Sequence, residues 1–351
     1  MAKQGLHVDT IYPVLKDAHT RTGWSLCIGA GTSSPIIPDW FQLVDSLIAK
    51  HCRAEDKINI DEYKKLGFSA DAMIQAVKNN LKSTDNEFIQ MLSDVIYEKI
   101  KNQLTTRQWK SFCVVHNSQN FSAIIKSAWN DFIYIRENVL NKTSAYQLAK
   151  VIISAIENDI APKTILTFNG EAILLAMMNS FYVDRGLGNK IVFDRVLNSI
   201  INTKQSRIPY IHCHGVVSIN GTAPKSGYIA NDKLVFSEDS YLHIANTTFS
   251  WQSANFINSC LNSKIVFIGV SLTDSNMRKW LSWIHSNKIN ELKENHLSQE
   301  NVTEHFWIKK SPPTKQEKLW IEESVSHLGI RLIWVDEWTQ VGTVLNKMLG
   351  L

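Results

Sequence analysis

The sequence is poor in cysteine, which limits the kinds of site that it can build. Its 351 residues contain five cysteines, and no two of them form a CxxC pair: Cys27, Cys52, Cys113, Cys213 and Cys260. This spacing supports neither a disulfide framework nor a zinc site, so we expect no bound metal and no zinc. Because Cys27, Cys213 and Cys260 lie in apolar stretches, we expect these three in the core.

A large excess of charge and long apolar runs are also missing. The 37 basic and 33 acidic residues leave a formal net charge of +4, which is too small to predict direct nucleic-acid binding. No uninterrupted apolar run reaches the roughly 18 residues that a transmembrane helix needs. The polar residues 1–10 lack the apolar segment of a signal peptide. The sequence therefore predicts a cytoplasmic protein without membrane contact.

What the sequence does contain is a set of short apolar runs bounded by turn residues. They lie at residues 24–28, 164–168, 208–213, 264–268, 305–308 and 330–335. Runs of this length fit strands that are buried on both faces of a parallel sheet. Because helical patterns separate most of them, the sequence predicts an α/β fold, a Rossmann-like domain over residues 1–351 with a mostly parallel sheet.

Residues 41–160 show helical patterns and few strand signals. Apolar residues between Phe88 and Ile100 recur at the spacing of one helical face, and Ser144 is a candidate cap for a later helix. We therefore expect a large helical insertion at 41–160, between the first and second strands of the sheet. Its apolar stripes are expected to form core, with a partner surface as the alternative. Residues 218–233 are expected to form a surface loop near the site.

The first chemical signal is the glycine-rich turn Gly29-Ala30-Gly31 after the run at 24–28. Glycine lets the backbone approach a pyrophosphate, and the N-terminus of a following helix would stabilise the phosphate charge. The GxGxxG fingerprint is incomplete, because Ser34 occupies the place of the third glycine. A tight structural turn would show the same pattern.

The second signal is an amide at the end of the run at 164–168. Asn169 would point into the crevice where ligands bind in open α/β sheets, or would serve as a turn former. Glu171 follows two residues later, where its carboxylate either hydrogen-bonds a ligand or caps the next helix.

The third signal is a pair of histidines at the end of the run at 208–213. His212 and His214 fall on the same face of a strand, but no third metal ligand lies nearby in the sequence. His214, which precedes Gly215, suits a general base in a cleft. His212 is expected to be a packed core residue.

A fourth run ends in a turn that carries a hydroxyl and a carboxylate. Ser271, two residues after Gly269, suits a hydrogen bond to a ribose or a phosphate. Asp274 either does the same or caps the helix expected from about Asn276. Together the four runs put polar groups at four strand ends on one rim of the sheet.

Read in order, these segments resemble the sirtuin superfamily. Residues 29–33 (GAGTS) and 37–40 (IPDW) resemble its phosphate-binding motif, GAGxS followed by IPDF. Residues 167–171 (TFNGE) resemble its TQNID element, 214–215 its catalytic HG pair, and 269–272 (GVSL) its GTSL ribose contact. Residues 234–241 and 271–276 look specifically like the bacterial sirtuin-like NADases of anti-phage defence. The resemblance spans residues 24 to about 338, excluding most of the helical block.

The resemblance implies a role for each matching residue in binding and cleaving NAD. Asn169 would position the nicotinamide ribose and the attacking water, and His214 would act as the base on a ribose hydroxyl. The pyrophosphate would bind at the first turn, and the adenosine ribose at Gly269 and Ser271. The resemblance implies these further positions in contact with NAD: Gly29, Ala30, Gly31, Thr32, Ser33, Asp39, Glu171, Gly269, Ser271 and Asp274.

The sequence departs from the sirtuin pattern in three ways. Phe168 and Glu171 replace the Gln and Asp of TQNID, and no arginine follows the IPDF-like motif, where Phe41 stands. No four-cysteine zinc module lies between His214 and Gly269. Deacylating sirtuins use that module to frame the acyl-lysine groove, so the resemblance favours NAD hydrolysis over deacylation.

The resemblance thus predicts an NAD+ glycohydrolase that depletes NAD in bacterial abortive defence against phage. Residues 340–351 are expected as a final helix with little room for a sensor, so we expect control by a separate subunit such as a HerA-type ATPase. The helical insertion is the expected assembly surface of a homo-oligomer. The alternative is a catalytically weak module that senses NAD or ADP-ribose and signals by assembly, which the changes at Phe168 and Glu171 favour.

Overall fold

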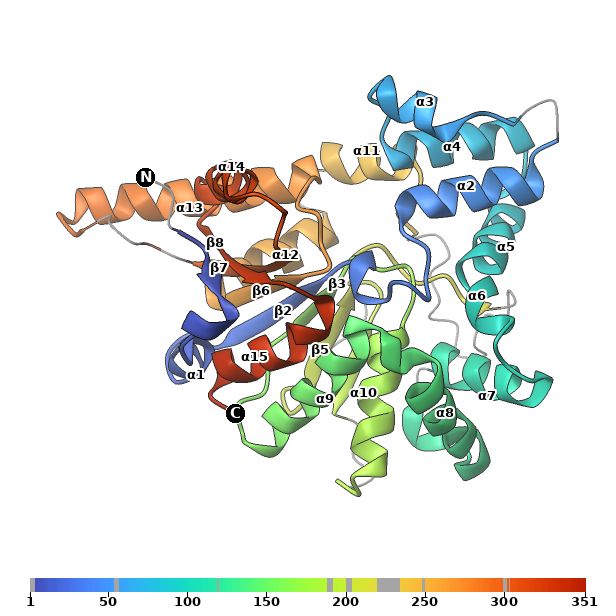
Figure 1. The fold of residues 1–351 in the computed structure, drawn as a ribbon, viewed down its shortest axis with the longest axis horizontal. Coiled ribbons are helices and arrows are strands. Elements are labelled where there is room, and N and C mark those ends of the chain that lie inside the picture. The colour runs from blue at the N-terminus through green and yellow to red at the C-terminus, as the bar shows by residue number, and fades with distance from the viewer. Residues whose placement is uncertain are drawn as a thin grey trace.

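The predicted parallel sheet is present and has eight strands, all parallel. The computed structural model describes residues 4–53, 57–118, 120–187, 192–199, 204–219, 234–247, 250–298, 302 and 304–351. The strand order is β1-β8-β7-β6-β2-β3-β5-β4 (Figure 1). The strands are β1 (Leu6–His7), β2 (Trp24–Ile28), β3 (Ile165–Thr167), β4 (Phe193–Val196), β5 (Ile208–His212), β6 (Lys264–Ile268), β7 (His305–Lys310) and β8 (Ile330–Val335).

Two of these strands, β1 and β4, have no counterpart among the predicted apolar runs. β1 has only two residues, which is too short to show any alternation. β4 contains Asp194 and Arg195, which interrupt its apolar pattern. Both lie at the outer edges of the sheet, where a strand pairs on one side only and carries a weaker apolar signal.

Strand β2 occupies the position at which the chain changes direction along the sheet. Leu26 pairs with Ile165 of β3 on one side and with Val266 of β6 on the other. β3, β5 and β4 continue in one direction, and β6, β7, β8 and β1 in the other. In such open sheets the crevice outside the carboxyl ends of the strands is the usual ligand site.

Helices cover both faces of the sheet, with a hydrophobic core between the sheet and the helices on each face. Successive residues of β2 point alternately into these two cores. Leu26 and Ile28 face the core beneath α9 (Ser144–Glu157), α10 (Ile173–Asp184) and α15 (Val341–Leu349). Cys27 faces the core beneath α12 (Trp251–Asn262), α13 (Ser275–Glu294) and α14 (Lys315–Ser326). Cys213 and Cys260 are buried in this second core, so the prediction for the three apolar cysteines is confirmed.

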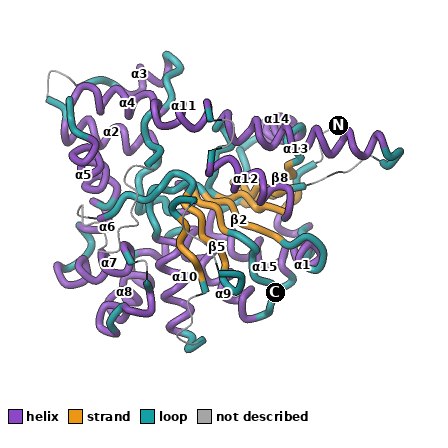
Figure 2. Tube along the Cα trace, turned by 180° about the vertical axis from the view of Figure 1, so that it is seen from behind, coloured by secondary structure: helices purple, strands orange, loops and turns teal. Residues whose placement is uncertain are grey.

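A group of helices from the first half of the chain lies to one side of the sheet (Figure 2). It comprises α2 (Trp40–His51), α3 (Ile60–Lys65), α4 (Ala70–Leu81), α5 (Asp85–Ile96), α6 (Glu98–Lys101), α7 (Thr106–Asn117) and α8 (Lys126–Asn138), which we call the helical region. The remaining helices are α1 (Val14–His19) and α11 (Glu238–Asn246). Helix α9 packs against α10 and α15 on the sheet and is therefore part of the α/β layer. The boundaries 41–160 of the insertion remain a prediction.

Two local expectations can also be compared with the structure. The cap of α9 is Thr143, whose side chain accepts from the Tyr146 N–H, so the prediction of Ser144 was wrong by one residue. Ser144 begins the helix instead. Most of the predicted loop 218–233 lies outside the described residues. Within the described ranges, no helix has both the length and the apolar character needed to cross a membrane.

Candidate functional site

The four predicted polar segments meet at the carboxyl edge of the sheet. Gly29 follows β2, Asn169 lies two residues beyond β3, His214 two residues beyond β5, and Gly269 directly follows β6. Because β6, β2, β3 and β5 are parallel neighbours in this order, their carboxyl ends lie on the same edge. The topology therefore brings together segments that are up to 240 residues apart.

The glycines of this edge allow two loops to touch backbone to backbone. The Gly31 N–H donates to the Gly269 carbonyl over 3.1 Å, and a Cβ on Gly29 would lie 2.6 Å from that same oxygen. Gly269 has a φ of +67°, and a Cβ there would lie 2.5 Å from the Thr32 nitrogen. A short 3-10 turn, Ala30–Thr32, follows Gly29, and helix α2 begins only at Trp40. The close contact between the two loops therefore explains why glycine stands at these positions. The contact of these glycines with a pyrophosphate remains a prediction.

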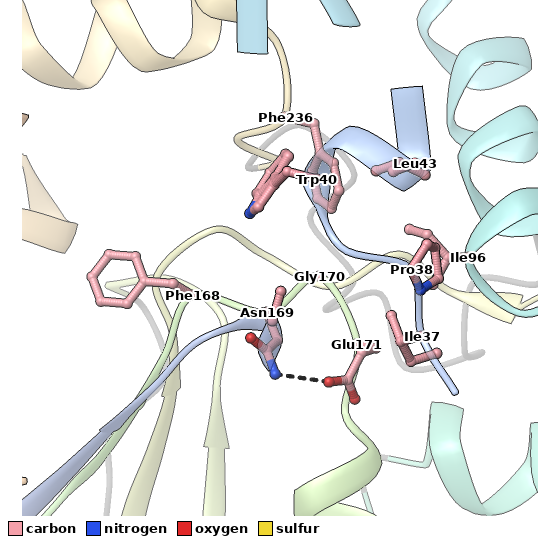
Figure 3. A pocket seen from close by; sticks show the side chains of 11 residues that line it. Ile37, Pro38, Trp40, Leu43, Ile96, Phe168, Asn169, Gly170, Glu171 and Phe236 are labelled. Atoms are coloured by element: carbon pink, nitrogen blue, oxygen red, sulfur yellow. Dashed lines mark hydrogen bonds between the residues drawn. The ribbon is translucent and has the colours of Figure 1, made fainter. Parts of the chain in front are cut away.

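Asn169 is held in one orientation by the loops around it. Its Nδ2 donates to the Thr32 Oγ1 over 3.2 Å. It also donates to the Glu171 Oε1 over 2.8 Å (Figure 3). An ionised carboxylate only accepts hydrogen bonds, so the nitrogen of the amide has to face Glu171. The Oδ1 on the other side is buried and has no hydrogen-bond partner within the described part of the chain. A buried acceptor without a partner is costly and calls for an explanation, such as a catalytic role or a bound water.

Glu171 connects the loop after β2 with the start of α10. Its Oε1 accepts from the Ser33 Oγ over 2.6 Å, and its Oε2 accepts from the backbone N–H of Ile173. Burial raises the pKa of the Glu171 carboxyl, while the hydrogen bonds from Ser33, Ile173 and Asn169 act in the opposite direction. Glu171 therefore both binds the first N–H of α10 and orients Asn169.

His214 is a buried imidazole surrounded by aromatic rings. Its ring centroid lies 4.9 Å from that of Phe168 and 5.1 Å from that of Tyr241. The Tyr241 hydroxyl lies 3.4 Å from the His214 Nδ1. Burial lowers the pKa of His214 to about 4, although a hydrogen bond with the Phe168 backbone and the charge of Asp71 oppose the shift. At neutral pH the ring is uncharged and able to accept a proton.

His212 behaves as the sequence predicted, as a core residue. It is fully buried, and burial followed by the charge of Arg195 lowers its pKa well below the usual value. Among the described residues, no group of three or more His, Cys, Asp or Glu side chains could hold a metal ion.

A pocket opens beside Asn169 and Glu171, with a polar floor and an aromatic roof (Figure 3). Its cavity volume is about 30 Å³, and the pocket is partly open to solvent. Trp40 and Phe236 form the roof, with ring centroids 5.1 Å apart. The Phe236 ring lies directly on Gly170, where a Cβ would be 2.1 Å from its Cζ. The lining residues are Ala30, Ile37, Pro38, Trp40, Leu43, Ile96, Phe168, Asn169, Gly170, Glu171 and Phe236.

Three residues proposed to contact NAD have other partners in the structure. The exposed Asp39 caps α2 by accepting from the Gln42 N–H over 2.8 Å. Asp274 caps α13 by accepting from the N–H groups of Asn276 and Met277, and burial raises its pKa. Ser271 is exposed, with its Oγ 2.7 Å from the Thr273 Oγ1. Their contacts with NAD remain predictions.

Sequence reasoning assigned no role to Tyr241 and Phe236, which border His214 and the pocket. Both lie within 234–241, a stretch noted only for its resemblance to the defence NADases. Their side chains carry no local signal for a site, because an aromatic residue beside a helix start is equally compatible with core packing. Only the fold shows that α11 and the segment before it return to the carboxyl edge of β5.

Comparison with known protein families finds a similarity for part of the chain. A family model described as the SIR2-like domain matches residues 180–328. The matched segment carries His214, Gly269, Ser271 and Asp274, while Asn169 lies before it. No curated protein matches the chain. Residues 180–328, less than half of the chain, are therefore similar to the SIR2-like domain, and this similarity suggests an NAD-related activity.

Proposed function

We propose that this chain hydrolyses NAD+ at the nicotinamide–ribose bond, releasing nicotinamide and ADP-ribose. The observation that carries the proposal is Asn169. Its amide nitrogen is occupied by Glu171 and Thr32, and its buried Oδ1 has no partner within the described residues. That oxygen is a preoriented acceptor at the carboxyl edge of the sheet, where nucleotides bind in this class of fold.

The reaction needs an acceptor for a hydroxyl group and a base, and the site supplies both. The Oδ1 of Asn169 accepts a hydrogen bond from the nicotinamide ribose or from the attacking water. The neutral ring of His214 takes the proton of a ribose hydroxyl. The bond between the ribose carbon and nicotinamide breaks, and the bond from that carbon to the water oxygen forms. His214 returns its proton to the ribose oxygen, and one proton of the water is released to solvent.

The aromatic roof supports the same chemistry. As nicotinamide leaves, positive charge develops on the ribose, and an aromatic ring face is attracted to a cation. Trp40 and Phe236 also cover one side of the pocket, and reduced access of water strengthens the electrostatic effect of the polar groups nearby.

The decisive experiment follows nicotinamide release from NAD by the purified chain and by two variants, Asn169→Ala and His214→Ala. We expect each to reduce kcat by ~10²-fold or more, because each removes a group that acts on the reacting ribose. Asn179→Ala is the matched control: Asn179 is also buried, but its amide binds the Leu175 carbonyl within α10. Full turnover by Asn169→Ala would rule the proposal out.

Absence of turnover by the wild type would call for one further measurement, the same assay with a candidate HerA-type ATPase added. If turnover is still absent and NAD binds measurably, the chain is a sensor of NAD or ADP-ribose instead. Calorimetry with NAD separates this result from a protein that does not bind the nucleotide at all.

We further propose that the activity depletes NAD during phage infection, within a homo-oligomer assembled through the helical region. The resemblance of 234–241 and 271–276 to the anti-phage NADases is its support. Cells that express the chain should lose NAD after infection, and cells that express Asn169→Ala should not. A chain that remains a monomer in size-exclusion chromatography, with and without the ATPase, would contradict the proposed assembly.

A further inference from the structure

The carboxyl end of helix α7 lies between the two loops that carry Asn169 and His214. His116, fully buried near this end, accepts the backbone N–H of Ala172 at its Nε2 over 3.0 Å. Its Nδ1 lies 3.0 Å from the Asn117 Oδ1. Burial, assisted by the charge of Arg195, lowers the pKa of His116 to about 3. The ring is therefore neutral, with its proton on Nδ1 toward Asn117 and its lone pair on Nε2 toward Ala172.

The next residue binds the other loop. The Asn117 Nδ2 donates to the Ile219 carbonyl over 3.2 Å, and its Oδ1 accepts from the Ile219 N–H over 3.2 Å. Two such bonds to one residue imitate the pairing of a β-strand. Tyr97, which follows α5, donates from its hydroxyl to the Val217 carbonyl over 2.7 Å. All three bonds fall on the segment that follows His214.

The end of α7 is in turn fixed to the sheet. Arg195 of β4 donates from Nη1 to the carbonyls of His116 and Ser118, over 3.0 and 3.1 Å. The last carbonyls of a helix have no partner within the helix and carry partial negative charge, so a buried guanidinium stabilises this end strongly. The two adjacent side chains of α7 therefore project from a rigid support.

We infer that His116 and Asn117 are positioning residues that clamp the two catalytic loops in register. The inference rests on the proposed function for its effect on turnover. His116 binds the residue next to Glu171, which orients Asn169. Asn117 binds the segment after His214. Because the two side chains are neighbours on one helix, a single turn of the helical region holds both loops, in addition to the direct bond from the Val217 N–H to the Gly170 carbonyl over 2.8 Å.

The variants are chosen to remove or to keep the atoms through which His116 and Asn117 bind the two loops. His116→Leu removes the acceptor for the Ala172 N–H, whereas His116→Gln can place its Oε1 where Nε2 stands. Asn117→Ala removes both bonds to Ile219. His305→Leu is the matched control: His305 is also fully buried and accepts a backbone N–H, that of Ile265, at the opposite, amino end of β6.

The first readout is the kinetics of nicotinamide release. We expect His116→Leu and Asn117→Ala to lower kcat at least tenfold with a smaller change in KM, because misplaced catalytic groups affect the transition state most. His116→Gln should recover most of that loss. His305→Leu should lower the thermal midpoint of unfolding with little change in kcat. Equal kinetic effects of His116→Leu and His305→Leu at matched loss of stability would overturn the inference.

The second readout, amide hydrogen exchange without NAD, separates this inference from the proposed function. His116→Leu should accelerate exchange at least tenfold in 169–173, and Asn117→Ala should do so in 215–219. His305→Leu should leave both segments as in the wild type. Unchanged exchange in the two α7 variants refutes the clamp even if NAD is hydrolysed. Accelerated exchange in a protein without NAD turnover, both alone and with the candidate ATPase added, supports the clamp and rejects the function.

Discussion

Mild acid should destabilise this protein strongly, because several of its histidines are buried and uncharged in the native state. Burial lowers the pKa of His116 and His305 to about 3 and that of His214 to about 4, from an ordinary value of 6.5. Nearby cations deepen the first two shifts, Arg195 at His116 and two lysines at His305. In the unfolded chain each ring takes up a proton below about pH 6.5, and in the folded chain it does not.

The sign and the size of the change in the free energy of unfolding follow from proton linkage. Below the unfolded pKa the unfolded state binds more protons, so stability is complete above about pH 6.5 and falls as the pH falls toward 4. At about pH 5, each of the three histidines costs about 2 kcal/mol, or about 6 kcal/mol together. His212 shifts in the same direction, while the raised pKa of Glu171 acts in the opposite one. The sum is comparable with the whole stability of a typical domain, about 5–15 kcal/mol.

Urea unfolding followed by tryptophan fluorescence, between about pH 8 and pH 5, measures the effect directly. His305→Asn isolates one histidine, since its Oδ1 can replace Nδ1 as the acceptor for the Ile265 N–H. We expect the variant to lose about 2 kcal/mol less than the wild type between these pH values. A free energy of unfolding that does not change over this range, or the same slope in both proteins, would refute the reasoning.

Three further results are expected. If His214 is the base, the acid limb of kcat should lie near its pKa of about 4 and not near 6.5, as long as the protein stays folded; a limb near 6.5 would assign the base to another group. Glu171→Gln should reduce turnover more than NAD binding, because the carboxylate accepts from Ser33 and Asn169 at Oε1 and from the Ile173 N–H at Oε2, and the amide nitrogen of Gln has to replace one of these two acceptors; calorimetry and nicotinamide release on the same preparation compare the two. Gly269→Ala should cost several kcal/mol more than Gly186→Ala in urea unfolding, since both have a φ near +67° but only the former places a Cβ against another backbone; equal costs would show that the loops move apart freely.

Six strands of the sheet were predictable from the sequence, and the reason is physical. A strand buried on both faces is apolar along nearly its whole length, so 24–28 and 264–268 were visible as apolar runs, interrupted only by Ser25 in the first and Lys264 in the second. β4 was not predicted, because the charged Arg195 interrupts its apolar pattern. Arg195 can be buried there because it donates to two carbonyls at the end of α7, and no local pattern reveals that partner. The cap of α9 was misplaced by one residue because Thr143 and Ser144 are both good caps.

The sequence by itself determined that Asn169, His214, Gly29 and Gly269 follow buried strands, and hence that they share one edge of a parallel sheet. Only the tertiary structure decided what each of them touches there. Gly29 faces the loop after β6, Asn169 is oriented by Glu171, and the loops that follow β3 and β5 both bind α7. The local sequence pattern predicts burial and backbone conformation, because these depend mainly on residues that are close in the sequence. A hydrogen-bond partner such as His116 for Ala172 depends on which distant segments the fold brings within 3 Å of each other, and this is set by the packing of the whole chain.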